Sequence, residues 1–315
     1  MTFSSSGKRA VGPRFGGLVV GAIVAGVFSV VVGCVAITRV GTGIGMATGH
    51  VDENQAAALE RSAEAVERSF EDFTPEQEHY IGRAVGAEIL SRYEPFDESK
   101  VNEYLNKIGQ SLAMASDRPE IFAGYRFVVL DTDEVNAFAS PNGLVMVTRG
   151  ILRLTDSEDG VAAILAHEIG HIEHKHGLAA IRTSRVTAAL TSAAITGVRV
   201  ASSEEIAELT DIFENSIEDI TSTLIDSGYS RGAEREADRA AVRMMQRLNY
   251  DPDALLALLE EMDAAFETKT IGLARTHPAP SRRIRVVERA MRDHPKPPAA
   301  TQARQERYER LLGAI

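Results

Sequence analysis

Two histidines four residues apart, His167 and His171, stand in the stretch AILAHEIGHIEHKHG at residues 163–177. On a helix that turns about 100° per residue, the second histidine falls about 40° from the first and one turn further along the axis. Both imidazoles can therefore reach a single metal ion. His174 shares this face but lies roughly 10 Å along the axis from His167, too far for the same ion on a regular helix. His176 points to the opposite side, so the spacing predicts a metal-binding pair of His167 and His171.

Glu168, beside this pair, indicates chemistry in addition to metal binding. It is too close in sequence to the two histidines to be a third ligand, but it is placed to contact a water molecule held by the ion. H-E-x-x-H is the arrangement of zinc peptidases, in which the glutamate acts as the general base. A histidine-rich surface helix is the alternative interpretation of the same residues.

A catalytic zinc needs a third protein ligand and one open position. Gly177 stands where an elongated motif would place a third histidine, so the candidate lies further on, in GAEREAD at residues 232–238. Glu234 and Asp238 share one helical face, whereas Glu236 points away. We expect Glu234 to ligate the metal and Asp238 to accept the free ring N–H of a ligating histidine, which orients that ring. Such acidic pairs are also common on solvated helix faces, which is the alternative interpretation.

Helix signals surround these motifs. A helix that begins near Ser157 carries the histidine pair, and one that begins near Ser230 carries Glu234. TPEQ, at residues 74–77, combines a capping hydroxyl, a proline at the first helical position and a glutamine at the third, and predicts a helix to about Tyr93. Further helices are expected after Asp97, after Asp251 and over residues 281–293.

Three short runs have the composition of strands, namely YRFVVLD at residues 125–131, VNAFA at 135–139 and LVMVT at 144–148. The turn signal SPNG separates the last two. The predicted fold class is therefore α+β and predominantly helical, with a small sheet of about three strands beside the helix that carries the histidines.

Composition excludes some classes of protein. The chain has 315 residues, 44% of them hydrophobic, and a formal net charge of −11. A nucleic-acid binder would need a basic face, so we expect no nucleic-acid partner. Cys34 is the single cysteine, and no intrachain disulfide can form.

The N-terminal residues predict attachment to a membrane. Basic residues precede an uncharged apolar run at residues 15–38 that ends in VVGCVAIT. VVGC resembles a bacterial lipobox, which would make Cys34 the lipidated first residue of the mature chain. The run is also long enough for an uncleaved transmembrane anchor, and a buried core helix is a third interpretation. The first two interpretations both place everything after residue 40 outside the cytoplasm.

The chain therefore divides into four expected segments. Residues 1–40 are a signal peptide with lipobox or a membrane anchor, and residues 41–73 are a glycine-rich tether followed by an acidic helical stalk. Residues 74–292 form the metallopeptidase domain that the motifs indicate. Residues 293–315 form a C-terminal tail.

From residue 74 to about 290 the chain resembles the gluzincin metallopeptidases, the family of the CaaX prenyl endoprotease, the heat-shock membrane protease and the periplasmic beta-barrel assembly-enhancing protease. The resemblance rests on five motifs in family order: FTPEQEHYIGRAVGAEIL, VNAFASPNG, AHEIGHIEHKH, YSRGAEREAD and THPAPSRRI. The layout is most similar to the small, singly anchored envelope members of this family.

The resemblance implies a zincin-like fold with one Zn²⁺ bound by His167, His171 and Glu234, and with Glu168 catalytic. It implies an endopeptidase that acts on misfolded or envelope proteins at the periplasmic side of a bacterial membrane. An edge strand near Asn136 and Ala137 would pair with the substrate backbone. A chaperone-like envelope assembly factor with a latent zinc site is the alternative function.

His277, in the loop THPAP, has three interpretations. It donates a hydrogen bond to the oxyanion, or it ligates zinc as a fourth ligand and holds the enzyme latent, or it only anchors its loop. We expect it near the zinc. We expect His174 and His176, by contrast, to be surface residues.

Overall fold

The computed structural model describes residues 73–180, 228–267, 280–292 and 302–313, together with residues 221, 225, 277 and 315. All of them lie in one compact unit of the chain, made of residues 72–185 and 207–315. The expected segment 1–40 with Cys34, and residues 41–72 of the expected tether and stalk, lie outside the described residues. No helix in the described ranges is both long enough and apolar enough to cross a membrane.

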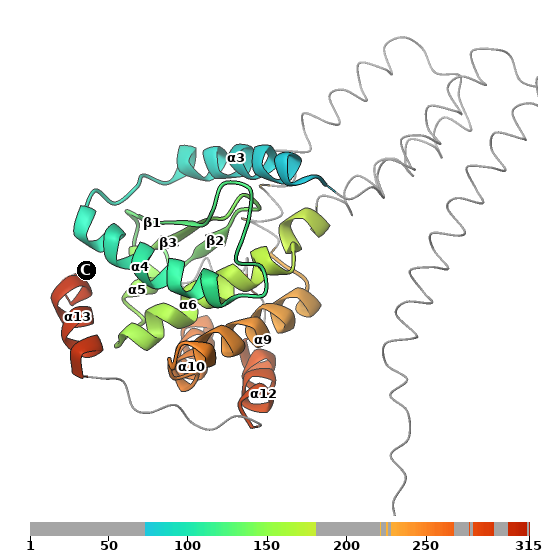
Figure 1. The fold of residues 1–315 in the computed structure, drawn as a ribbon. Coiled ribbons are helices and arrows are strands. Elements are labelled where there is room, and N and C mark those ends of the chain that lie inside the picture. Colours follow the sequence, from blue (N-terminus) through green and yellow to red (C-terminus); the bar gives the residue numbers. More distant parts are fainter. Residues whose placement is uncertain are drawn as a thin grey trace, which may run out of the picture. The chain divides into compact units, whose positions relative to one another are not determined.

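Helices form most of the described structure, and one three-stranded sheet lies among them (Figure 1). The expected α+β class with a predominance of helix is confirmed. In chain order the elements are α3 (Pro75–Arg92), α4 (Ser99–Ala115), β1 (Arg126–Leu130), β2 (Ala137–Ala139), β3 (Leu144–Thr148), α5 (Arg149–Leu152), α6 (Glu158–Glu173), α9 (Arg231–Arg247), α10 (Asp253–Glu267), α12 (Pro280–Met291) and α13 (Gln302–Leu312).

β3 is the central strand of the sheet, whose order is β1-β3-β2. β1 runs parallel to β3, whereas β2 runs antiparallel to it and pairs Ala137 with Val147. Gly143, in the turn between β2 and β3, has a φ of 85°, a left-handed conformation that glycine adopts without strain. Among the described residues β2 is therefore an edge strand, and it contacts α6.

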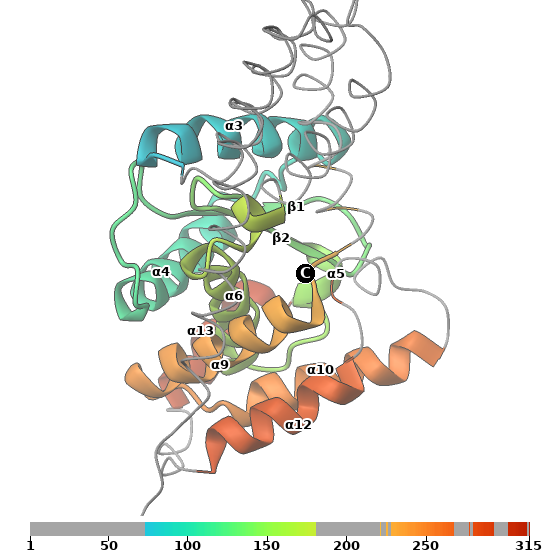
Figure 2. The same cartoon turned by 90° about the vertical axis from the view of Figure 1, so that its right-hand side faces the viewer.

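α6 is the central helix of the core, because every residue from Glu158 to Ile172 is buried. Its first turn is capped by Ser157, whose Oγ accepts a hydrogen bond from the backbone N–H of Gly160 at 3.3 Å. A helix that is buried on every side belongs to the protein interior, and α4, α9 and α10 pack against α6 (Figures 1 and 2). The histidine pair consequently lies in the core, and the surface-helix interpretation is wrong.

A glycine allows α6 and α9 to approach each other closely. A Cβ atom built on Gly170 would lie 2.9 Å from the Cα atom of Ala237 and 3.2 Å from the Cβ atom of Ala240. Only small residues fit at such a crossing. The contact brings the H-E-x-x-H segment of α6 against the first turns of α9, which carry Glu234.

The stretch expected to be a C-terminal tail, residues 293–315, contains a helix that belongs to the core. In α13 the side chains of Tyr308 and Leu312 are buried. Arg307 donates hydrogen bonds to both carboxylate oxygens of the buried Glu158, at 2.7 and 3.0 Å. Because α13 has few apolar residues and is held by ion pairs with a distant helix, its sequence pattern alone did not predict that it packs.

Candidate active site

His167 and His171 point to one place from successive turns of α6. Their Nε2 atoms lie 3.1 Å apart, and their rings are 4.7 Å apart between centroids. Both side chains are buried, with 6% and 1% of their surface exposed. The wheel argument for this pair therefore agrees with the structure.

Glu234 approaches the pair from a different part of the chain. It lies in the first turn of α9, which Ser230 caps by accepting a hydrogen bond from the N–H of Ala233 at 3.2 Å. Its Oε1 is 3.4 Å from Nε2 of His171, and its Oε2 is 3.5 Å from Nε2 of His167. The two separate motifs thus converge as the sequence indicated.

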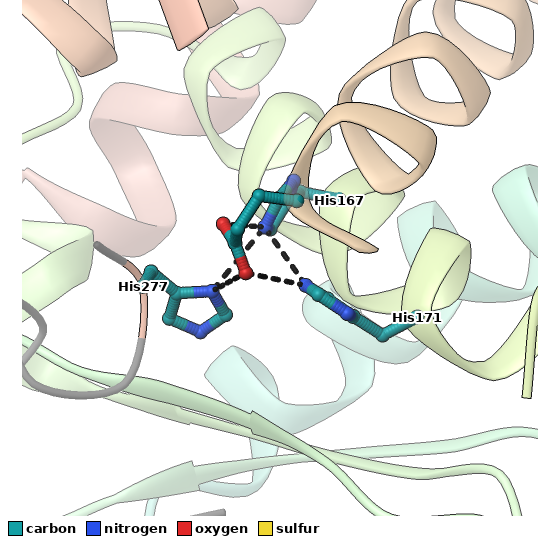
Figure 3. A group of neighbouring side chains, drawn as sticks. His167, His171 and His277 are labelled. Atoms are coloured by element: carbon teal, nitrogen blue, oxygen red, sulfur yellow. Dashed lines mark hydrogen bonds and ion pairs between the residues drawn. The ribbon is translucent and has the colours of Figure 1, made fainter. Parts of the chain in front are cut away.

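His277 completes the group. Its Nδ1 lies 3.0 Å from Oε1 of Glu234 and 3.4 Å from Nε2 of His167. Figure 3 shows the three labelled imidazoles directed toward one another. One ligand atom from each of the four side chains lies within 4.8 Å of the other three, and all four residues are buried. Three imidazoles and a carboxylate are nitrogen and oxygen ligands that suit tetrahedral zinc.

Glu168 supplies an independent test of whether a metal fits here. Its Oε2 is buried and has no hydrogen-bond partner among the described residues, and Oε1 lies 3.6 Å from Nε2 of His277. An unpartnered buried carboxylate oxygen costs free energy, and a water molecule on an adjacent cation would satisfy it. Burial raises the pKa of Glu168, which suits a residue that takes and returns a proton. The residues present therefore fit a divalent metal ion.

Asp238 lies one turn beyond Glu234, behind the histidine pair. Its Oδ1 is 3.1 Å from Nδ1 of His167, the ring nitrogen that faces away from the metal group. This is the contact that we expected for an orienting carboxylate. Such contacts fix the tautomer of a ligating histidine and make it a better donor.

Arg283 is the functional residue that the sequence reasoning missed. It is buried, and it donates to Asp238 through Nη2 at 2.7 Å and through Nε at 3.0 Å. Its Nη1 lies 3.0 Å from Oε2 of Glu234. One signal in the sequence was available: Arg283 stands four residues before Val287, so the two share one face of the expected helix. The structure buries both residues, whereas the other arginines of α12 are exposed.

These contacts determine the ionisation of the two acids on α9. Burial alone would raise the pKa of Glu234, but the neighbouring side chains of His277 and Arg283 outweigh it and hold the pKa well below its ordinary value. Burial likewise opposes ionisation of Asp238, and Arg283 with His167 lowers its pKa to about 2. Both side chains are therefore carboxylates at neutral pH, as a metal ligand and its orienting partner need to be.

His176 is not the surface residue that we expected. It is buried, and its Nδ1 lies 2.9 Å from Nδ1 of His171. α6 ends before His174, and Lys175 has a φ of 55°, so the helix is broken there and the helical-wheel argument does not extend to residue 176. Nε2 of His176 is 3.1 Å from Oε2 of Glu236. His174 is exposed, as expected.

Asn136 and Ala137, the expected substrate-binding residues, lie at the start of the edge strand β2. The side-chain oxygen of Asn136 accepts a hydrogen bond from the N–H of Ala137 at 2.9 Å. Neither residue belongs to the group of four potential metal ligands described above. Tyr229 links the two regions: its ring stacks on that of His171 at 4.0 Å, and its hydroxyl donates to the carbonyl oxygen of Ala139 at 3.5 Å.

Comparison with known proteins places this site in a family. Residues 99–291 match the model of peptidase family M48. The beta-barrel assembly-enhancing protease of Yersinia pestis is 28% identical over 220 residues, which are 68% of this chain and 44% of that protein. The mitochondrial metalloendopeptidase OMA1 of Schizosaccharomyces pombe is 32% identical over 159 residues, 49% of this chain and 42% of that protein. Metalloprotease YcaL of Escherichia coli is 26% identical over 185 residues, 59% of this chain and 68% of that protein.

The chain spans less than half the length of the beta-barrel assembly-enhancing proteases that it matches. The family match nevertheless covers more than half of the 315 residues and includes α6, α9 and α12, the elements that carry most of the site. The resemblance inferred from the five motifs is confirmed. The chain belongs to peptidase family M48.

Proposed function

We propose that this chain is a zinc-dependent endopeptidase that hydrolyses peptide bonds in misfolded or envelope proteins. The observation that carries this proposal is the convergence of four buried ligand-type side chains, from α6, α9 and the loop before α12, next to a buried glutamate. Related proteins bear the names of proteases, which supports a protein substrate.

In the proposed mechanism His167, His171 and Glu234 would hold one zinc ion. Bound there, zinc would lower the pKa of a water ligand toward ~7 and polarise the scissile carbonyl. Glu168 accepts the proton of the attacking water and returns it to the leaving amine, since its buried carboxylate has a raised pKa. Asp238 keeps the ring of His167 oriented, and Arg283 keeps Asp238 and Glu234 ionised and in place.

We assign to His277 the role of a fourth, inhibitory ligand. Its Nδ1 lies within the ligand group, 3.0 Å from Oε1 of Glu234. With zinc bound, four protein ligands would close the site, whereas a catalytic zinc site keeps one position for water. Activity would then require that His277 withdraw. The position of Nδ1 of His277 among the ligand atoms also favours the second candidate function, a chaperone-like envelope assembly factor with a latent site.

We propose further that the edge strand β2, near Asn136 and Ala137, receives the substrate by adding a strand to the sheet. The hydroxyl of Tyr229 on the carbonyl of Ala139 marks one end of this edge. We place the peptidase domain on the periplasmic side of a bacterial membrane, attached through lipidated Cys34 or a helix at residues 15–38. The name of the Yersinia pestis relative, a beta-barrel assembly-enhancing protease, supports this location.

The proposal is tested with Glu168→Gln, which removes the base and keeps the size of the side chain. The variant is expected to retain zinc and to lose at least 100-fold of the rate on unfolded casein, because general-base catalysis contributes about 10²–10⁴-fold. Glu261→Gln, an exposed glutamate on α10, is the matched control and should cleave as the wild type does. Chelator should abolish cleavage by the wild type, and zinc should restore it. Casein digestion by Glu168→Gln at the wild-type rate would refute the assignment.

A further inference from the structure

A polar cavity lies between α9 and α12, beside the metal group. Its volume is about 250 Å³. Five of the residues that line it are exposed arginines, Arg231, Arg235, Arg282, Arg285 and Arg289. Glu234, Arg283 and Val286 complete the lining.

The five arginines face the same cavity because of their spacing along the two helices. Arg282, Arg285 and Arg289 recur every three or four residues and so occupy one face of α12, and Arg231 and Arg235 occupy one face of α9. α9 and α12 pack against each other, which brings the two cationic faces together. Within the described part of the chain, none of the five forms an ion pair, unlike the buried Arg283.

Five converging cations are unfavourable without an anion, because like charges at this helical spacing repel one another. This concentration of positive charge contrasts with the chain as a whole, which carries a formal net charge of −11. Arg231 is the first residue of α9, where the helix dipole adds positive potential. A bound anion would remove this repulsion.

We propose that the cavity between α9 and α12 binds a phosphate group, either as free phosphate or as the headgroup of an anionic phospholipid. Guanidinium groups match the geometry of phosphate oxygens with paired hydrogen bonds. A volume of about 250 Å³ is several times the ~30 Å³ share of a water molecule in the liquid, so it holds a phosphate with a small substituent. A cavity of this volume with five converging guanidinium groups favours a compact, multiply charged anion over the spaced carboxylates of an acidic peptide. This proposal does not depend on the proposed peptidase function.

The test compares the full-length chain with the triple variant Arg282→Gln/Arg285→Gln/Arg289→Gln. Melting temperature is measured in sodium phosphate and in sodium chloride at equal ionic strength. The wild type should gain about 3–6 °C at a phosphate concentration ten times the dissociation constant. The triple variant should gain less than 1 °C, and Arg83→Gln, at an exposed arginine of α3, should respond as the wild type does.

Two further measurements distinguish a lipid headgroup from free phosphate, and a phosphate ligand from an acidic peptide. Vesicles of phosphatidylglycerol should stabilise the wild type more than vesicles of phosphatidylcholine do if the headgroup is the ligand, and the triple variant should lose that difference. Stabilisation by phosphate without a lipid difference assigns the site to free phosphate. No response of the wild type to phosphate, an equal response of the triple variant, or stabilisation by a glutamate-rich peptide alone overturns the proposal. Without phosphate the variant should melt no lower than the wild type, because repulsion has been removed.

A separate observation concerns the ring nitrogen of His171 that does not face the metal group. Nδ1 of His171 lies 2.9 Å from Nδ1 of His176, and Nε2 of His176 lies 3.1 Å from Oε2 of Glu236. If Nε2 of His171 binds a metal, its Nδ1 carries the hydrogen and donates it. Nδ1 of His176 then accepts, and its Nε2–H donates to Glu236. One set of tautomers therefore satisfies the whole chain of hydrogen bonds.

We infer that His176 and Glu236 are positioning residues that orient His171 for the metal. This inference rests on the zinc site of the proposed function. Histidine takes here the place that a carboxylate or carbonyl usually occupies behind a metal ligand, where its loss typically weakens metal affinity 10–100-fold. Glu236 is half exposed, so it orients the ring of His176 from the surface.

The test is zinc affinity, measured by competition with a chromophoric chelator on the full chain. His176→Ala should weaken binding about 10–100-fold, and His176→Asn, whose amide oxygen can accept from His171, should recover most of the loss. His174→Ala, at an exposed neighbour, is the matched control and should bind as the wild type does. Equal affinity of wild type and His176→Ala overturns this inference alone, whereas failure of the wild type to bind zinc overturns the proposed function.

Discussion

Replacing Asp238 by asparagine tests the buried ion pair behind the metal group. The substitution keeps the shape of the side chain and an oxygen that can accept from His167, and it removes only the negative charge. Arg283 then keeps one partner, Glu234, at 3.0 Å. The structure thus isolates the contribution of one charge to stability.

Two estimates of the magnitude agree. Removing one partner of a buried ion pair costs about 3–5 kcal/mol, and the remaining contact with Glu234 favours the lower end. A fall in the pKa of Asp238 from 3.8 to about 2 corresponds to stabilisation on the order of 2 kcal/mol at neutral pH. We therefore expect a loss of about 2–3 kcal/mol in unfolding free energy, or about 4–12 °C in melting temperature for a domain of this size.

The assay is urea unfolding of the chelator-treated chain, so that metal binding does not contribute. Asp238→Asn, Arg283→Met and the double variant form a cycle, in which the double variant should lose less than the sum of the two single variants. Glu103→Gln, in an exposed pair with Lys107 at 2.8 Å, is the control and should change stability by less than about 0.5 kcal/mol. Additivity of the two single losses within about 0.5 kcal/mol would refute the coupling.

Three other predictions follow from the site and its support. His277→Ala should raise casein hydrolysis severalfold if this residue closes the site, and a fall in rate would show instead that it assists the reaction. Arg307→Ala should lower the unfolding free energy by about 1–2 kcal/mol, because the buried carboxylate of Glu158 loses the charged donor that Arg307 provides. Unchanged urea unfolding would show that this pair does not hold α13 in place. Because the folded pKa of Asp238 is lowered to about 2, its contribution is complete above the unfolded pKa of about 4 and is lost as pH falls toward 2. Melting scans between pH 5 and 2 should therefore fall more steeply for the wild type than for Asp238→Asn, and parallel curves would contradict the assignment.

Local sequence patterns predicted those site residues whose positions follow from regular helix geometry. His167 and His171 share a face of α6, and Glu234 and Asp238 share a face of α9, because helical periodicity determines which side chains point together. The capping box at Thr74 and Gln77 formed as expected, with hydrogen bonds of 3.0 and 3.2 Å. The convergence of the two helices was inferred from the chemistry that a metal requires, since nothing in either motif alone specifies it.

The residues that sequence reasoning missed depend on tertiary contacts or on irregular backbone. Arg283 was one arginine in a charged helix, and its burial follows from the way α12 packs on α9. His176 returned to His171 only because Lys175 adopts a left-handed conformation after α6 ends. α13 packs through Arg307 and Tyr308 against residues far away in sequence. Periodicity can place a residue such as Arg283 on an apolar helix face, but it does not specify which distant residues that face contacts.

X-ray absorption at the zinc edge of the purified, zinc-loaded chain tests the central claim most directly. The account predicts a single zinc with about four nitrogen and oxygen ligands at about 2.0–2.2 Å, and with the outer-shell scattering of two or three imidazole rings. Replacing Glu234 by alanine should abolish that spectrum together with stoichiometric binding. A shell of six oxygens without imidazole scattering, or zinc retained unchanged by the Glu234→Ala variant, would contradict a metal centre built from α6 and α9.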